Sequence, residues 1–142
     1  MGIMQGKTIL VTGVLTDHSI AFSVAKLIQD EGGTPILTSF GRAMGATERA
    51  NGRLPKPATI LELDVTNEEQ VNDFFYDNKP DYCINASAYT AVDLAETDKE
   101  KAFAINADGV AHLAQACVEC KSTLIHVSTD YVFDGSTNLP YS

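Results

Sequence analysis

The 142-residue sequence lacks an apolar run close to the ~18 residues that a membrane-spanning helix needs. Its first residues also lack the signal-peptide pattern of a basic start followed by an apolar stretch. No low-complexity segment interrupts a composition that is 44% hydrophobic and 20% charged. A chain of this size buries enough surface to form a core without disulfides or metals. We therefore expect one soluble, cytoplasmic domain over residues 1–142, with no membrane partner.

Basic residues are few: ten Lys and Arg stand against nineteen Asp and Glu, for a formal net charge of −9. Binding to a nucleic-acid backbone requires a basic face that neutralises phosphates. The charge balance therefore argues against nucleic acid as a partner. The three arginines, Arg42, Arg49 and Arg53, all fall in one short window.

Cysteine is also scarce, with Cys83, Cys117 and Cys120 in the whole chain. Cys117 and Cys120 form a Cys-x-x-Cys pair at the end of a helical pattern, whereas redox pairs open a helix whose dipole stabilises the thiolate. A zinc site needs further ligands at regular spacing, and the three histidines are spread along the chain. We expect free thiols, no disulfide framework and no metal site.

Short β-branched segments alternate with longer amphipathic segments along the chain. Strands are predicted at Thr8–Thr12, Thr34–Ser39, Ile60–Asp64, Tyr82–Asn85 and Leu124–Val127. Helices are predicted from Ser19 to the Gly32-Gly33 stop, over Met44–Asn51, over Glu68–Asp77 after a Thr66 or Asn67 cap, and in two pieces between Ala91 and Cys120. Such alternation predicts right-handed βαβ units and a parallel sheet covered on both faces. The expected fold is α/β, a truncated Rossmann-type doubly wound sheet of about five strands in order 3-2-1-4-5.

The apolar spacing also predicts which face of each helix is buried. In the first helix, Ile20, Val24, Leu27 and Ile28 recur at three- and four-residue intervals. In the last helix, the predicted apolar side consists of Phe103, Val110, Leu113, Ala114 and Cys117.

The first strand leads into the turn Gly13-Val14-Leu15-Thr16-Asp17-His18, and a helix begins near Ser19. The turn has one glycine, not the three of the usual dinucleotide fingerprint. Gly13 still permits a sharp turn, and the helix N-terminus offers N–H groups and a positive dipole end to a phosphate. The Ser19 hydroxyl either bonds a phosphate oxygen or only caps the helix.

Residues 5–69, from QGKTILVTGVLTDHSIAFSVAKLIQDEGG to RLPKPATILELDVTNEE, resemble the N-terminal part of NADH-dependent enoyl-acyl-carrier-protein reductases of the mycobacterial type. The TGxxxDxSIA turn is specific to that branch of the short-chain dehydrogenases. This resemblance implies that the pyrophosphate and ribose are held by Gly13, Val14, Leu15, Ser19 and Ile20. It also implies that Phe40 lies against the adenine, with Asp64 and Val65 at the ring's edge.

The segment from Lys79 to Ser142 resembles a second family, the dTDP-4-dehydrorhamnose reductases, which are extended short-chain dehydrogenases. The motifs NASAYTAVD, AFAINA and STDYVFDG carry this resemblance in order. It implies cofactor contacts from Asn85, Ala86, Ser87, Tyr89 and Ser128, and it matches Thr129 to the threonine that assists the catalytic tyrosine. We interpret the mosaic as an engineered chimera, enoyl-reductase-like over about 1–70 and dehydrorhamnose-reductase-like over about 71–142, joined between Asp64 and Asp77. A natural divergent protein with the same mosaic is the alternative.

Both families reduce their substrates with a tyrosine and a lysine, spaced Tyr-x-x-x-Lys in the sugar reductases. No tyrosine of this chain has a lysine four positions later. Without the tyrosine there is no proton donor. Without the lysine, nothing lowers the pKa of that donor or holds the nicotinamide ribose. Tyr131 is a candidate acid without its lysine. We expect a domain that binds a nicotinamide dinucleotide without efficient turnover; the alternatives are a recombined scaffold with no ligand and an oxidoreductase with weak activity.

The cofactor type and the oligomeric state are less determined by the sequence. The end of the second strand, Thr38-Ser39-Phe40-Gly41-Arg42, has no carboxylate to exclude a ribose 2′-phosphate, and Arg42 can pair with one, which favours NADP(H). The enoyl-reductase resemblance favours NAD(H), and the arginines can equally be solvated. We favour NAD(H) and leave NADP(H) open. The fifth strand, near apolar Val127 and Val132, is expected to be an exposed edge that favours a homodimer.

Overall fold

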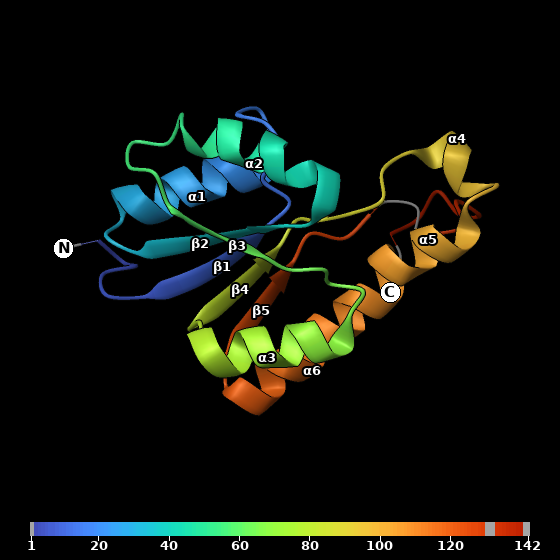
Figure 1. The fold of residues 1–142 in the computed structure, drawn as a ribbon. Coiled ribbons are helices and arrows are strands. Elements are labelled where there is room, and N and C mark those ends of the chain that lie inside the picture. The colour runs from blue at the N-terminus through green and yellow to red at the C-terminus, as the bar shows by residue number, and fades with distance from the viewer. Residues whose placement is uncertain (1, 130–132, 141–142) are drawn as a thin grey trace.

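The computed structural model describes residues 2–129 and 133–140. Its strands form one parallel sheet: β1 (Thr8–Thr12), β2 (Thr34–Ser39), β3 (Thr59–Glu62), β4 (Tyr82–Asn85) and β5 (Thr123–His126). Their order is β3-β2-β1-β4-β5 (Figure 1). Every neighbouring pair is parallel. The predicted α/β Rossmann-type fold and its strand order are confirmed.

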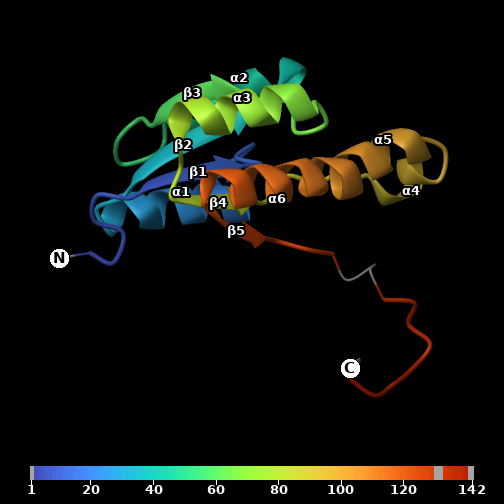
Figure 2. The same cartoon turned by 90° about the horizontal axis from the view of Figure 1, so that it is seen from below.

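Helices cover both faces of this sheet (Figures 1 and 2). One face carries α1 (Ile20–Asp30) and α2 (Met44–Asn51), which follows the 3-10 turn Gly41–Ala43. The other face carries α3 (Glu68–Asn78) and α6 (Gly109–Cys120). The segment predicted as two helical pieces has α4 (Val92–Ala95), α5 (Lys99–Phe103) and a π-turn, Ala104–Asp108, that continues directly into α6.

The two long helices that follow β1 and β3 each begin at a side-chain cap. The Ser19 hydroxyl accepts a hydrogen bond from the Phe22 amide at 3.2 Å. The Asn67 side chain accepts one from the Gln70 amide at 3.1 Å, so Asn67, not Thr66, caps α3. Each cap satisfies an amide that has no partner inside the helix.

The sheet separates two cores, because alternate residues of a strand point to opposite faces. Ile9 and Val11 of β1 pack with α1 and α2, while Leu10 packs with α3 and α6. All three side chains are fully buried. The continuous apolar run of β1 is therefore that of a strand covered on both sides.

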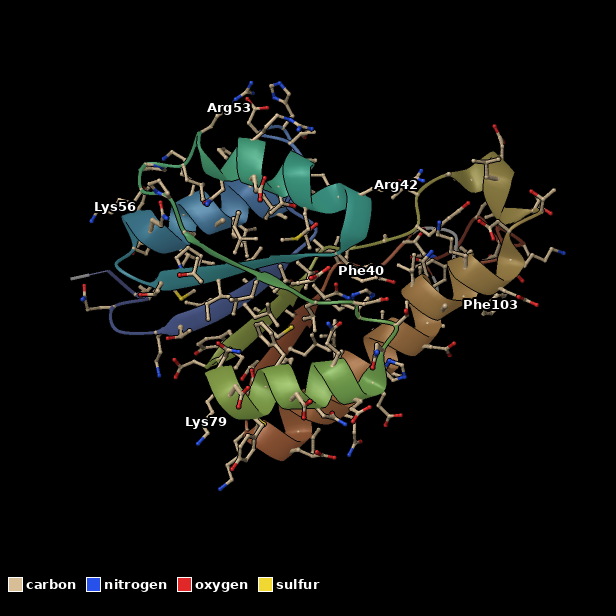
Figure 3. The ribbon with its side chains drawn as sticks, in the orientation of Figure 1. Phe40, Arg42, Arg53, Lys56, Lys79 and Phe103 are labelled. Carbon is tan, nitrogen blue, oxygen red and sulfur yellow. The ribbon has the colours of Figure 1, made fainter. Side chains whose placement is uncertain are left out.

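The predicted buried face of α1 is partly wrong. Ile20 and Leu27 are 63% and 59% exposed. The buried residues are Ala21, Phe22, Ala25 and Ile28. The small alanines allow α1 to lie close to the sheet, so they take the central position and the larger residues flank it. Phe103 is also mostly exposed, because α5 extends past the end of the sheet (Figure 3).

The amino ends of β1 and β4 are joined by one carboxylate. Asp81 accepts hydrogen bonds from the Lys7 ammonium and the Thr8 amide, each at 2.9 Å. The Lys7 ammonium, helped by the Thr8 amide, holds the pKa of the Asp81 carboxyl below its ordinary value. These contacts fix the register of the β1–β4 pair at the end of the sheet opposite the pocket described below.

The cysteines are free thiols, and Cys83 of β4 and Cys117 of α6 are buried in the core between the sheet and α6. A hydrogen bond between these two side chains, together with burial, raises the pKa of the Cys83 thiol. Among the residues that the structure describes, no group of three or more His, Cys, Asp and Glu is arranged to hold a metal ion. In the same part of the chain, no helix is long and apolar enough to cross a membrane.

Replacing Phe75 tests the core between the sheet and α3. Phe75 is fully buried, whereas its neighbour Tyr76 is 73% exposed. We expect Phe75→Ala to lower the free energy of unfolding by about 3–5 kcal/mol, because it leaves a cavity. Tyr76→Ala, the matched control, should change it by less than about 1 kcal/mol. Urea denaturation measures both, and equal losses would contradict this assignment of the core.

Candidate functional site

The carboxyl ends of the first four strands surround a pocket of about 510 Å³. This volume lies within the usual range for a small-molecule site. The lining residues are Thr12, Gly13, Leu15, Thr16 and Ser19 from the β1–α1 segment, residues 38–40 and Ala43 after β2, residues 63–65 after β3, residues 86–88 and Thr90 after β4, and Ile105 of the π-turn. Strand order reverses between β1 and β4, so the pocket lies at the topological switch point where doubly wound sheets bind ligands.

A buried hydrogen-bond network joins β1 to β4 at this switch point. The Thr12 hydroxyl donates to Asn85 Oδ1 at 2.6 Å and accepts from the Ala86 and Ser87 amides at 3.2 and 3.1 Å. Asn85 Oδ1 also accepts from the Ser87 hydroxyl at 2.6 Å. Thr12 and Asn85 are almost completely buried. The network folds the segment after β4 back across the end of β1 and thereby forms one wall of the pocket.

The same network reaches β5 through His126. Asn85 Nδ2 lies 3.2 Å from His126 Nδ1. Because Asn85 Oδ1 already accepts from two hydroxyl groups, the amide nitrogen faces the imidazole and donates to it. His126 Nδ1 is then the acceptor, which places the proton of the neutral ring on Nε2.

Gly13 is the point where the β1–α1 turn touches the segment after β4. Its φ is +82°, a conformation that favours glycine. A Cβ at this position would lie 2.5 Å from the Ala86 carbonyl oxygen and 2.8 Å from the Ser87 nitrogen. The single glycine of the turn is therefore required both by the backbone conformation and by this close approach.

The rest of the β1–α1 turn is held by side chains from the α2 region. Thr47 of α2 is fully buried and donates its hydroxyl proton to the Val14 carbonyl at 2.7 Å. Asp17 forms an ion pair with Arg53, which lowers the pKa of the Asp17 carboxyl. Arg53 is thus bound to this turn, on the outer side of α2 (Figure 3).

Ser19 and Asp64 line the pocket and also make local contacts. Besides capping α1, the Ser19 hydroxyl donates to the Thr16 carbonyl at 2.7 Å. Asp64 Oδ1 accepts from the Thr66 amide and hydroxyl at 3.0 and 2.7 Å, which shapes the turn into α3. Asp64 is the charged member of the described lining. A bound pyrophosphate would therefore depend on backbone N–H groups and the N-terminus of α1 for its compensation.

The predicted cofactor residues fall into two groups in the structure. Those that line the pocket are Gly13, Leu15, Ser19, Phe40, Asp64, Val65, Ala86 and Ser87. Those outside the described lining are Val14, buried beneath the turn; Ile20, exposed on α1; Asn85, in the buried network; and Tyr89, Ser128 and Thr129, with the last two exposed after β5. Tyr131, the candidate acid, lies outside the described residues, as does Val132 of the predicted edge.

Tyr89 is held from three sides next to the pocket wall. The Asn106 side chain binds its main chain, and Lys101 Nζ lies 5.9 Å from the centre of its ring. Its hydroxyl donates to Asp98 at 3.4 Å. Desolvation, and then the Asp98 carboxylate, raise the pKa of the Tyr89 phenol. The ring therefore contacts α5 and the residue before it.

Hydrogen bonds that support the pocket come from four residues to which the sequence analysis gave no role: Thr12, Thr47, His112 and His126. Threonines inside an apolar strand or a helix resemble ordinary element formers, and neither histidine lies in a motif. For Thr12, its position directly before Gly13 is the local signal that was available.

Substitution of Gly13 tests the contact between the β1–α1 turn and the segment after β4. Gly6 provides a matched control, because its φ is +74° and a Cβ there would meet nothing within 4 Å. Gly6→Ala should cost about 1–2 kcal/mol for the left-handed conformation alone. We expect Gly13→Ala to cost at least about 1 kcal/mol more, because the new methyl group overlaps Ala86. Equal losses in urea denaturation would contradict the close approach.

Comparison with known proteins finds two kinds of relative. A dTDP-4-dehydrorhamnose reductase of Mycobacterium tuberculosis is 58% identical over 104 residues, which cover 70% of this chain and 34% of the relative. One from Aggregatibacter actinomycetemcomitans is 43% identical over 97 residues, covering 68% of this chain and 33% of the relative. An enoyl-acyl-carrier-protein reductase (NADH) of Mycolicibacterium smegmatis is 52% identical over 71 residues, covering 50% of this chain and 26% of the relative.

These matches confirm the mixed resemblance predicted from the sequence. The chain spans about a third of the length of the two sugar-nucleotide reductases and about a quarter of the enoyl reductase. The family model described as the RmlD substrate binding domain matches residues 24–142. This match extends over far more than half of the chain, which therefore belongs to the RmlD substrate binding domain family.

Proposed function

We propose that this chain binds a nicotinamide dinucleotide across the switch point between β1 and β4. The pocket at the carboxyl ends of the strands carries the proposal, because it combines the Gly13 turn, the N-terminus of α1 and the wall after β4 in one cavity. Doubly wound sheets bind dinucleotides in this crevice, with the pyrophosphate at the first helix. A relative that is 52% identical over 71 residues is named for NADH, which supports the same ligand here.

The two sides of the pocket suit the two halves of such a ligand. The adenosine half belongs on the β2–β3 side, where Phe40 offers a half-exposed ring and Asp64 and Val65 form the wall. The nicotinamide half then extends toward Ala86 and Ser87 on the β4 side. Ser128 and Thr129 follow β5 on that side of the sheet. We propose them as further contacts of the nicotinamide half.

We propose binding without efficient turnover for the chain as given. Tyr-x-x-x-Lys is absent from it. Reduction of a substrate carbonyl requires a proton donor as well as the hydride of the cofactor. Weak oxidoreductase activity of the kind named for its relatives remains the second candidate, with Tyr131 as its acid.

A two-parent origin accounts for the mosaic of motifs. We infer that the enoyl-reductase-like part, up to about residue 70, supplies Gly13, Phe40 and Asp64. The dehydrorhamnose-reductase-like part supplies Asn85 and Ser87. The hydrogen bonds of Thr12 cross from one part to the other, so ligand binding reports whether the two parts meet correctly. The alternative is a recombined scaffold whose pocket binds no ligand. The titration described next distinguishes the two.

Isothermal titration with NADH and NADPH tests the proposal. We expect saturable binding in the micromolar range, because the pocket is preformed at the switch point. NADH should bind more tightly than NADPH, because the enoyl-reductase relative is named for NADH. An absence of heat and of any shift in melting temperature up to millimolar cofactor would contradict it.

Arg42→Ala tests the role of the arginine after β2. This change should leave the affinity for NADH unchanged. It should weaken the affinity for NADPH if Arg42 pairs with the 2′-phosphate. Arg49→Ala is the control and should change neither affinity.

We also propose self-association through β5. Among the described strands, β5 pairs with β4 alone, which leaves its outer edge open. Ile125 and Val127 are 49% and 40% exposed beside that edge. An open edge with apolar neighbours favours pairing with a second copy.

Sedimentation velocity at increasing concentration tests this association. We expect a monomer–dimer equilibrium that Ile125→Lys shifts toward monomer, because a charge then lies beside the edge. The control, Val118→Lys, alters a residue that is 74% exposed on α6 and should leave the equilibrium unchanged. A single monomeric species at high concentration would contradict the proposal.

A further inference from the structure

One continuous helix contacts two walls of the pocket. From Lys99 to Cys120 the chain is helical without interruption, through α5, the π-turn and α6. Ile105 of the π-turn lines the pocket itself. A π-turn inserts an extra residue into a helix and often occurs at functional sites. Here it rotates the residues that precede α6 relative to α6 itself.

Asn106, in the π-turn, binds the segment after β4. Its Oδ1 accepts from the Tyr89 amide at 2.8 Å, and its Nδ2 donates to the Tyr89 carbonyl at 3.1 Å. Both main-chain polar groups of Tyr89 are thus bound by one side chain. Ala88 and Thr90, on either side of Tyr89, line the pocket. The position of this wall therefore depends on Asn106.

His112, six residues further along the same helix, binds the segment after β3. Its Nδ1 lies 3.0 Å from the Val65 carbonyl oxygen, which can only accept, so Nδ1 carries a proton. Gly109, between Asn106 and His112 in the helix, lies so close to Val65 that a Cβ at this position would be 2.9 Å from Val65 Cγ2. Val65 lines the pocket on the side assigned above to the adenosine half.

We propose that Asn106 and His112 are positioning residues for the dinucleotide, with Asn106 setting the nicotinamide-side wall and His112 the adenosine-side wall. The inference rests on the proposed function, since it assigns each wall to one half of that ligand. Neither side chain needs to touch the ligand, because each acts through the main chain of a pocket segment. The π-turn lets one helix present both groups to their separate walls.

The experiment compares NADH with ADP, which has only the adenosine half and the pyrophosphate. Asn106→Ala should weaken NADH by about three- to tenfold, the value of one or two hydrogen bonds, and leave ADP binding unchanged. His112→Ala should weaken both ligands by a similar factor. His112→Asn should restore them, because the asparagine amide donates from nearly the position of Nδ1. Gln115→Ala, which removes an exposed side chain of α6 that bonds only Glu119 in the described contacts, is the control and should change neither.

Equal weakening of both ligands by Asn106→Ala, or failure of His112→Asn to restore binding, would overturn the inference and indicate general loss of structure. If the unaltered chain binds neither NADH nor ADP, the proposed function is wrong. The effect of Asn106 on the wall after β4 is then tested by amide hydrogen exchange. Asn106→Ala should then speed exchange of the Tyr89 amide at least tenfold and leave the Thr66 amide unchanged. Unchanged exchange at Tyr89 would overturn the role.

Discussion

The hydrogen bond between Thr12 and Asn85 is the contact on which the pocket depends. Thr12 and Asn85 stand 73 positions apart in the sequence. The carboxyl ends of their strands must stay together for the segment after β4 to fold over the Gly13 turn. The contact is buried, so loss of either partner leaves an unsatisfied polar group in the core. Asp81 fixes the opposite end of the same strand pair through Lys7 and Thr8.

Around that pair, three segments of the pocket wall are each held by a second element on the outside. Thr47 of α2 supports the β1–α1 turn, His112 of α6 supports the end of β3, and Asn106 supports the segment after β4. The walls are loops, which position a ligand well only when their main chain is bound by rigid elements. The pocket therefore depends on helices that contribute little to its lining.

Much of the fold and part of the site followed from the sequence. Strand order came from the alternation of elements. The two family resemblances predicted Gly13, Phe40, Asp64 and Ser87 as cofactor contacts, and all four line the pocket. The buried face of α1 was predicted incorrectly, because large apolar residues such as Ile20 gave a stronger pattern than the alanines that allow close packing. The supporting residues His112 and His126 were missed because their partners, Val65 and Asn85, are distant in sequence.

By itself, the sequence determined the parallel sheet, its order and the placement of the pocket at the switch point, because these follow from local periodicity and the handedness of βαβ crossovers. It also determined that Tyr-x-x-x-Lys is absent. The tertiary structure alone decided that the two motif-bearing parts meet through Thr12 and Asn85, that Gly13 contacts Ala86, and that one π-turned helix reaches two walls. These contacts join residues far apart in the chain, and their geometry exists only once the sheet has formed.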